Sequence, residues 1–126
     1  MEYKELTEKI IGCAYAVYNK MGYGFLENVY ERCMLIELRE QGIKAESQKS
    51  IAVYYNDELV GEFVPDLIVD DKIIVELKSV AKIVKAHEMQ LVNYLSGTKM
   101  PVGLIINFSE SRVEVKRKVK DLQNKT

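Results

Sequence analysis

Three residues in the middle of the chain have the types and spacing of a divalent-metal site. The segment PDLIVDDKIIVELK contains Asp66, then Glu76, and Lys78 two positions after Glu76. Because side chains alternate between the two faces of a β-strand, Glu76 and Lys78 are expected to be neighbours on one face. Carboxylate oxygens are hard ligands that suit Mg²⁺ or Mn²⁺. A lysine beside them could orient a water molecule or stabilise charge on a phosphate, so the pattern favours phosphoryl-transfer chemistry.

The turn between the two strands decides whether Asp66 joins that face. If residues 70–72 form a three-residue hairpin loop, Asp66 falls directly opposite Glu76. A two-residue loop pairs Asp66 with Val75 instead and puts the two acids on opposite faces. The metal site therefore requires an odd-length turn or a compensating bulge.

A purely structural interpretation of the same residues is a solvated strand face with cross-strand ion pairing. Against it, Glu76 and Lys78 flank Leu77 at the end of the apolar run KIIV. A structural strand at this position would favour further apolar residues, because buried charge is costly. The metal-site hypothesis is the stronger of the two.

Two amphipathic helices are expected ahead of these strands. Apolar residues follow a spacing of three to four over residues 5–20, and Gly22 is placed to end that helix. A second apolar stripe covers residues 26–41 and ends at Gly42. The two cysteines, Cys13 and Cys33, lie within these helices, where free thiols are expected rather than a disulfide or metal ligands.

After the helices the pattern changes to short runs rich in Val, Ile and Tyr. SIAVYYN, ELVGEFVPDLIV and KIIVELKSV predict three antiparallel strands. Residues 87–95 return to helical spacing, and the apolar run VGLIINF after Pro101 predicts a buried strand. Residues 112–120 fit a short strand or an extended tail. The expected order is α-α-β-β-β-α-β, with or without a final β, in an α/β fold whose helices cover the sheet of one core.

Composition narrows the class of protein without naming a function. The 126 residues, 48% of them hydrophobic, fit one domain spanning 1–126. No stretch approaches the roughly 20 apolar residues of a membrane span, and the charged start MEYKELTEK does not fit a signal peptide. A soluble, cytoplasmic protein is expected.

The formal net charge of −1 gives no global attraction to nucleic acid, so any such binding would depend on a local patch. Basic residues gather in the middle of the chain and near its C-terminus. They form either a phosphate-facing surface or a solvated face. They are Lys78, Lys82, Lys85, Lys116, Arg117, Lys118 and Lys120.

Several motif blocks in order resemble those of a known family. GFLENVY has the G-x-x-E-x-x-Y pattern at Gly24, Glu27 and Tyr30. VPDLIVDDKIIVELK, HEMQLVNYL and VGLIINF follow it, so the resemblance to the GxxExxY proteins covers roughly residues 5–110. That family looks like a small branch of the PD-(D/E)xK nuclease superfamily. The resemblance implies a restriction-endonuclease-like core, with a mixed central β-sheet flanked by helices, and hydrolysis of nucleic-acid phosphodiesters.

The resemblance also implies roles for individual residues. Glu27 would be the helix-borne acid, and Asp66 and Glu76 would be ligands of Mg²⁺ or Mn²⁺. The backbone carbonyl of Leu77 would be a further metal ligand, and Lys78 would position the attacking water.

Residues on the helix after the Glu-x-Lys strand are expected to support this site. Gln90 and Tyr94 match a Q-x-x-x-Y feature of many exonuclease-like members, and their spacing puts them on one helix face. His87 lies one turn earlier on that face, where we expect contact with the acidic cluster or a phosphate rather than direct acid–base work. Tyr30 is expected to pack in helix two with its hydroxyl bonded near the site.

Three functional hypotheses follow. The first is a metal-dependent nuclease acting on nucleic acid, with DNA as the expected substrate. A homodimer would extend its surface, and the strand IAVYY either supplies such an interface or belongs to the core. The second is a nuclease-fold module without useful catalysis that binds nucleic acid or a protein. The third is an unrelated structural domain whose acids face solvent. The intact set of acids favours the first.

Overall fold

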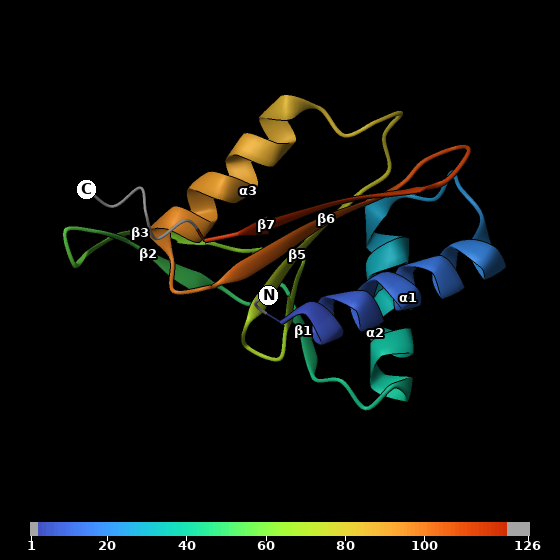
Figure 1. Ribbon diagram of the computed structural model, residues 1–126, viewed down its shortest axis with the longest axis horizontal. Coiled ribbons are helices and arrows are strands. Elements are labelled where there is room, and N and C mark those ends of the chain that lie inside the picture. Colours follow the sequence, from blue (N-terminus) through green and yellow to red (C-terminus); the bar gives the residue numbers. More distant parts are fainter. Residues whose placement is uncertain (1–2, 121–126) are drawn as a thin grey trace.

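The chain folds around a five-stranded mixed sheet, as a computed structural model describes it for residues 3–120 (Figure 1). The strand order in the sheet is β1-β4-β5-β6-β7, and a separate two-stranded ribbon consists of β2 and β3. The elements are α1 Lys4–Met21, α2 Glu27–Glu40, β1 Ala45–Ser47, β2 Ile51–Tyr55, β3 Glu58–Phe63, β4 Leu67–Val69, β5 Ile73–Lys78, α3 Lys85–Gly97, β6 Val102–Phe108 and β7 Val113–Val119.

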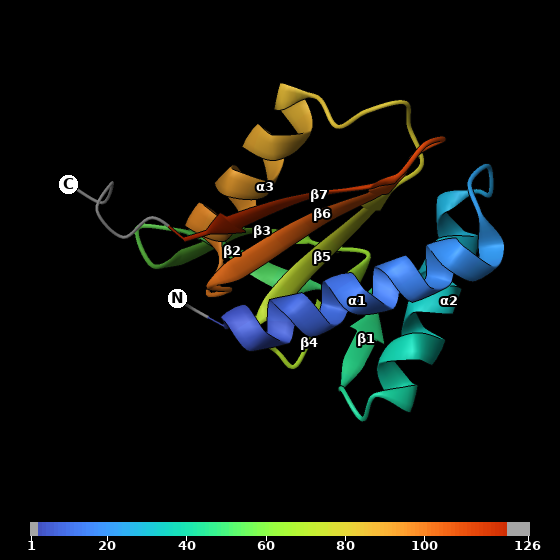
Figure 2. The same cartoon turned by 45° about the vertical axis from the view of Figure 1, so that its right-hand side comes forward.

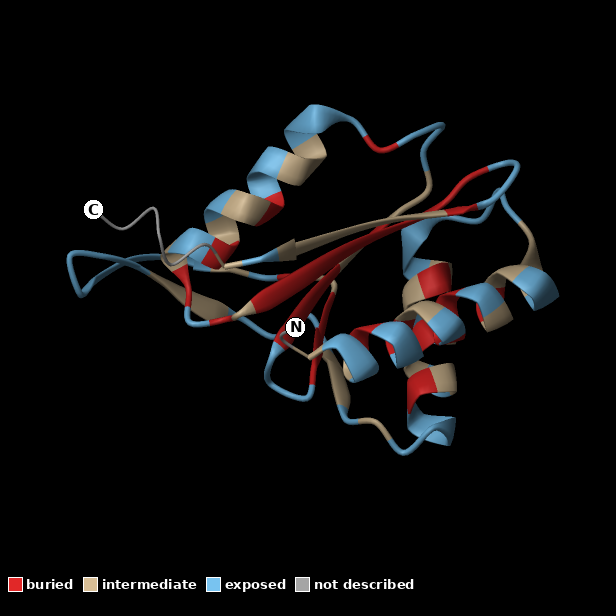
Figure 3. Ribbon diagram, viewed as in Figure 1, coloured by how far each residue is buried: buried red, intermediate tan, exposed pale blue. Residues whose placement is uncertain are grey.

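The neighbouring strands β5 and β6 are parallel, and α3 is the crossover between them; the other pairs in the sheet are antiparallel. Every residue of β6 is buried, and Figure 3 shows it as a continuous buried strand between β5 and β7. This explains the nearly continuous apolar run VGLIINF, because a strand covered on both faces has no solvent-exposed face on which polar side chains would alternate.

The sheet has a hydrophobic cluster on each face. Ile73, Val75 and Leu77 of β5 pack in one cluster with α1 and α2. Ile74, on the opposite face of the strand, packs in a second cluster with residues of α3. Figure 2 shows α1 and α2 covering one side of the sheet while α3 lies on the other. The even-numbered residues of β5, including Glu76 and Lys78, therefore face α3.

Sequence and structure agree on the helices and on the fold class. The first two helices begin and end within one residue of the expected limits, whereas α3 is longer than expected and spans Lys85–Gly97. Both cysteines are free, with Cys13 buried and Cys33 half-buried. Residues 113–119 form strand β7 rather than an extended tail. No helix in the described residues is long and apolar enough to cross a membrane.

The expectation of three antiparallel strands after the helices was wrong in two respects. The segment ELVGEFVPDLIV breaks around Pro65 into β3 and β4, which lie in different sheets. Proline has no N–H to donate to a strand ladder, so the chain leaves the ribbon there and enters the sheet. The short strand β1 was also missed, because three half-polar residues carry no recognisable pattern. The IAVYY segment lies in the ribbon, where Tyr54 and Tyr55 are exposed.

The turn that joins β4 to β5 has three residues. Val69 pairs with Ile73, and Lys72 N–H donates to the Val69 carbonyl at 3.0 Å. Asp70 and Asp71 both adopt φ 54°, in the left-handed region that aspartate tolerates better than most residues. This is the odd-length turn that the metal-site hypothesis requires.

Close packing of α3 on the sheet depends on Gly103 in β6. A Cβ atom added there would lie 2.6 Å from Leu91 Cδ1 and 3.1 Å from Leu91 Cγ. Leu91 is buried within the α3 cluster, so its side chain has little room to move away. Glycine at this position therefore lets the helix approach the strand.

We expect Gly103→Ala to lower the free energy of unfolding by about 1–3 kcal/mol through overpacking against Leu91. Denaturant unfolding with circular dichroism would measure it. Gly12→Ala in α1 is the matched control, because nothing lies within 4 Å of the added atom and alanine favours a helix, so that variant should be slightly stabilised. Equal stability of Gly103→Ala and wild type would contradict this account of the packing.

Candidate active site

Asp66 and Glu76 face each other at the point where the β4–β5 pairing ends. Asp66 N–H donates to Glu76 Oε1 at 3.1 Å, and Leu77 N–H donates to Asp66 Oδ2 at 2.8 Å. Two positions before Leu67 lies Pro65, which has no N–H to continue the ladder toward Leu77. The two side chains thus continue the pairing of the strands where the backbone ladder stops, and this fixes both carboxylates.

The electrostatics of this pair favour a bound cation. The pKa of Glu76 is raised to about 7: burial raises it most and the charges of Asp66 and Glu27 also raise it, while the hydrogen bond from Asp66 N–H and the charge of Lys78 lower it. Placing two carboxylates together away from water is unfavourable unless a proton or a metal ion neutralises them. The donor set is all oxygen, which fits Mg²⁺ or Mn²⁺. Within residues 3–120, no three His, Cys, Asp or Glu side chains are grouped closely enough to hold a metal by themselves.

A second pair of acids lies at the start of α2. Glu27, in the first turn of the helix, is exposed, and its charge acts on Glu76. Glu31, one turn later, is half-buried; burial raises its pKa, the charge of Asp66 raises it too, and a hydrogen bond from Gln48 at 3.0 Å lowers it. Sequence analysis missed Glu31. The signal was its i+4 spacing from Glu27, which puts both residues on one side of the helix.

On the other side of the carboxylates, α3 closes a narrow pocket over the sheet. Glu76 and Lys78 line it from β5, and His87, Gln90 and Tyr94 line it from α3. Its volume is about 10 Å³, which is of the order of the space one water molecule needs. Five of the predicted site residues therefore line one pocket, whereas Asp66 and Glu27 do not line it.

Two of these α3 residues also have structural contacts. The Tyr94 ring stacks on Phe63 of β3, with ring centroids 3.6 Å apart and an interplanar angle of 9°. His87 Nδ1 accepts a hydrogen bond from Val84 N–H at 3.2 Å, which caps the start of α3. The ring contact holds the ribbon against α3 beside the site. Because His87 Nδ1 accepts a hydrogen bond, Nε2 carries the proton when the imidazole is neutral.

Tyr30 is a packing residue, as its place in the apolar stripe indicates. It is fully buried and stacks on Phe108 with centroids 4.1 Å apart. Its hydroxyl donates to the Gly22 carbonyl at 2.6 Å and accepts a hydrogen bond from Phe25 N–H at 3.4 Å. Tyr30 therefore holds the α1–α2 loop that leads into Glu27.

Asn107 and Glu114 form a clamp that sequence analysis did not find. Asn107 is fully buried; its side chain accepts from Val80 N–H and donates to the Val80 carbonyl, both at 2.9 Å. Its amide also donates to Glu114 Oε1 at 3.2 Å, and that oxygen accepts from Ile83 N–H at 2.9 Å. The clamp fixes the loop between Lys78 and α3. The signal was one asparagine within an apolar strand, where a buried amide needs partners.

The alternative to a metal site is a purely structural role for Asp66 and Glu76. Every buried side-chain nitrogen or oxygen of the described residues has a hydrogen-bond partner, so the carboxylates are satisfied as acceptors. An amide at Glu76 could accept the same bond without the charge. A half-buried carboxylate with a raised pKa, opposite a second acid and beside a lysine, is typical of functional sites.

Comparison with known proteins agrees with this geometry. The sequence model of the PD-(D/E)XK nuclease superfamily matches residues 4–118. The chain belongs to the PD-(D/E)XK nuclease superfamily. Nucleases of this superfamily generally use divalent metals. The match is made at the level of the superfamily, so closer kinship to the GxxExxY proteins stays a prediction. The hypothesis of an unrelated structural domain is excluded.

A solved structure shows the same fold. The crystal structure of SSO0001 resembles this PD-(D/E)XK domain with a TM-score of 0.59 and 17% sequence identity. The likeness covers 95% of this chain and 60% of that chain. A search among curated proteins found no match. The restriction-endonuclease-like arrangement of a mixed sheet with flanking helices is thereby confirmed.

The raised pKa of Glu76 predicts how stability depends on pH in metal-free buffer. Between pH 4.5 and about 7 the folded protein holds a proton that the unfolded chain releases, so this residue makes the wild type less stable as pH rises. Glu76→Gln removes that loss. We expect the variant to be more stable than wild type at pH 8, by roughly 3 kcal/mol at most, and to differ little at pH 4. Urea unfolding across this range, with EDTA present, would measure the difference; a pH-independent difference would contradict the assignment.

Proposed function

We propose that this protein is a divalent-metal-dependent nuclease that hydrolyses phosphodiester bonds of nucleic acid, with DNA as its substrate. The observation that carries the proposal is the opposition of Asp66 and Glu76, with Lys78 on the same strand face. The two carboxylates exchange backbone hydrogen bonds at 3.1 Å and 2.8 Å, in a place where burial makes their joint charge unfavourable. Membership of a nuclease superfamily supports the same reaction class.

Asp66 and Glu76 are proposed to hold Mg²⁺ or Mn²⁺, with the Leu77 carbonyl as a further ligand. When bound, the cation would polarise the scissile phosphate and lower the pKa of a coordinated water. Glu27 and Glu31 approach from α2 and add negative charge that attracts the cation. Lys78 orients the attacking water and balances the charge that develops on the phosphate.

The residues of α3 complete the site from above the sheet. Gln90 lines the same pocket as Glu76 and Lys78, and its amide can donate to a phosphate oxygen or to a water. Tyr94 and His87 position the helix through their contacts with Phe63 and Val84. These roles support catalysis by orientation rather than by proton transfer.

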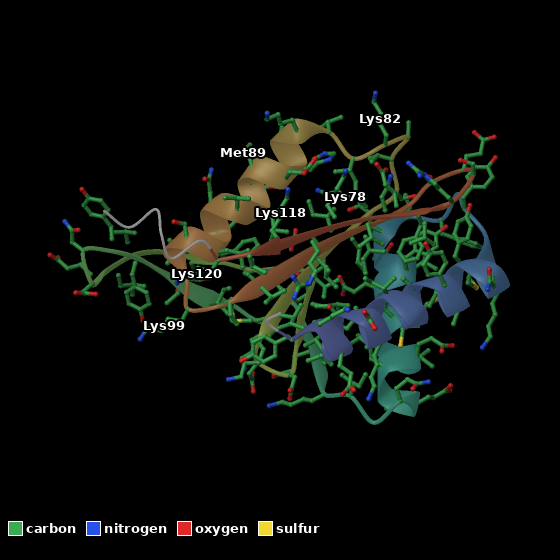
Figure 4. All side chains as sticks on the ribbon, viewed as in Figure 1. Lys78, Lys82, Met89, Lys99, Lys118 and Lys120 are labelled. Carbon is green, nitrogen blue, oxygen red and sulfur yellow. The ribbon has the colours of Figure 1, made fainter. Side chains whose placement is uncertain are left out.

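A group of lysines offers a surface for the phosphate backbone. Lys85, Lys116 and Lys118 lie close enough to Glu88 of α3 for their charges to lower its pKa, and Lys118 also bonds it at 2.8 Å. Figure 4 shows Lys82, Lys118 and Lys120 spaced along the side of the molecule where α3 and β7 lie. Because the net charge of the chain is only −1, binding to nucleic acid would depend on a local basic surface such as this one. A binding module without catalysis is not favoured, because such a module needs no opposed carboxylates. The homodimer stays a prediction.

Metal titration tests the proposal directly. We expect calorimetry to show Mn²⁺ and Mg²⁺ binding to the wild type, and at least a tenfold loss of affinity in Asp66→Asn and in Glu76→Gln, as expected for loss of a ligand. Lys78→Ala should still bind metal but cleave labelled DNA roughly 10²–10³-fold more slowly. Asp57→Asn, an exposed acid in the β2–β3 turn, is the matched control and should behave as wild type.

Three outcomes would overturn this function. Absence of metal binding by a folded wild type would remove the shared site, and metal binding without cleavage of any DNA or RNA would leave a binding module. Cleavage that survives in Asp66→Asn would place the chemistry elsewhere.

The lysine surface has its own test in the salt dependence of DNA binding. Lys82→Ala should weaken binding at low salt and reduce the slope of log K against log salt by about 1, because one phosphate contact is lost. Lys72→Ala, in the β4–β5 turn at the opposite end of β5 from Lys78, is the matched control. Fluorescence anisotropy at several salt concentrations would measure both slopes. Equal slopes in the two variants would show that the surface around Lys82 does not bind the backbone.

A further inference from the structure

A second and larger pocket lies at the end of the sheet where β5 stops. Its volume is about 660 Å³, and three segments line it: residues 23–28 of the α1–α2 loop and the start of α2, residues 79–81 after β5, and residues 108–110 of the β6–β7 turn. Figures 1 and 2 both show that loop and that turn at the same end of the molecule. The pocket adjoins the candidate active site, because Glu27 lines it and also acts on Glu76.

Aromatic rings shape this pocket. Tyr23 is 55% exposed and Phe25 is 40% exposed, although rings of this size usually avoid water. Phe108 lies in the lining as well, stacked on the fully buried Tyr30. The Phe25 ring meets the Tyr30 ring edge-on, with centroids 6.0 Å apart and an interplanar angle of 85°. The exposed rings are thus continuous with the buried aromatic stack of the core.

Hydrogen bonds hold the loop that carries these rings. Ser79 Oγ donates to the Phe25 carbonyl at 2.9 Å, and the Tyr30 hydroxyl donates to the Gly22 carbonyl at 2.6 Å. Gly24 adopts φ 106°, a conformation that other residues reach only with strain. The backbone that carries these rings is therefore held in place before any ligand arrives, which lowers the entropy cost of binding.

The charge of the pocket selects against phosphate. Its lining contains two carboxylates, Glu27 and Glu110, and no lysine or arginine among the residues described there. Basic residues instead flank the lining segment 79–81 in the chain, where Lys78 precedes it and Lys82 follows it. This lining suits a flat, uncharged aromatic ring better than an anion.

A nucleobase in a strand is a ligand of this kind, since each base is a flat ring that connects phosphates on both sides. Bases inside a duplex are stacked and paired, so they cannot reach an aromatic pocket unless they are extruded. We propose that this pocket binds one unpaired nucleobase next to the scissile phosphate, so that the protein acts on single-stranded or locally unpaired nucleic acid. The proposal rests on the nuclease function and specifies its substrate.

The test compares an oligothymidine with an abasic oligonucleotide of the same length, by fluorescence anisotropy with EDTA present to prevent cleavage. Wild type should bind the oligothymidine more tightly. Tyr23→Ala should weaken that binding about 5- to 100-fold, as for loss of one stacked base, and should leave the abasic strand nearly unaffected. Tyr23→Phe keeps the ring and should bind as wild type. Tyr15→Ala, which removes a tyrosine of α1 that is 47% exposed and outside the pocket, is the matched control.

Phe25→Ala tests the pocket with a second variant and should likewise weaken binding of the oligothymidine. Circular dichroism would verify its fold, because the Phe25 ring contacts Tyr30.

Equal affinity of wild type for the two strands would overturn the base pocket, as would a loss in Tyr23→Ala that is the same for both strands. Asp66→Asn should lose metal binding but keep the preference for the strand with bases. A protein that cleaves with metal and shows no such preference would overturn the pocket alone. A protein that shows the preference but binds no metal would overturn the proposed nuclease function alone.

Discussion

The hydrogen bonds exchanged between the Asp66 and Glu76 segments are the constraint on which the candidate site depends. Each acid uses a carboxylate oxygen to bind a backbone N–H of the neighbouring strand segment, where Pro65 has ended the regular ladder. The geometry exists only because the β4–β5 turn has three residues. A turn shorter by one residue would move one acid to the opposite face, among the apolar side chains that pack on α1 and α2.

The same arrangement places the Glu76 carboxylate in an environment that is unfavourable for its negative charge. Glu76 is held where burial and the charge of Asp66 raise its pKa to about 7. Sites that work on charged substrates commonly keep such groups at a cost in stability, and the remainder of the fold must supply the compensation. Here it comes from the fully buried strand β6 and the clusters on both faces of the sheet. The Asn107 and Glu114 clamp adds rigidity at the point where the chain leaves the site.

Two sides of the sheet contribute to the site in different ways. Helix α2 brings Glu27 and Glu31 near the carboxylates, whereas α3 brings His87, Gln90 and Tyr94 to the pocket over Glu76 and Lys78. The end of the central strand is the place where both groups can reach the same atoms, as is usual for open α/β sheets. The lysine surface beside α3 and the aromatic pocket beside α2 then suggest where the phosphates and a base of one strand would lie.

The sequence by itself determined the helices and the buried strand β6, because these features are local. It left two registers open for the Asp66 and Glu76 strands, and the three-residue turn of the structure decided between them. Apolar spacing marks a helix face, and the length of one turn sets which residues of a hairpin are opposite. It also placed Gln90 and Tyr94 on one helix face. Only the tertiary structure decided that β3 and β4 part at Pro65, that Glu31 approaches Asp66, and that Asn107 holds the loop before α3. These features depend on contacts between segments far apart in the chain, and neither periodicity nor spacing carries information about such contacts.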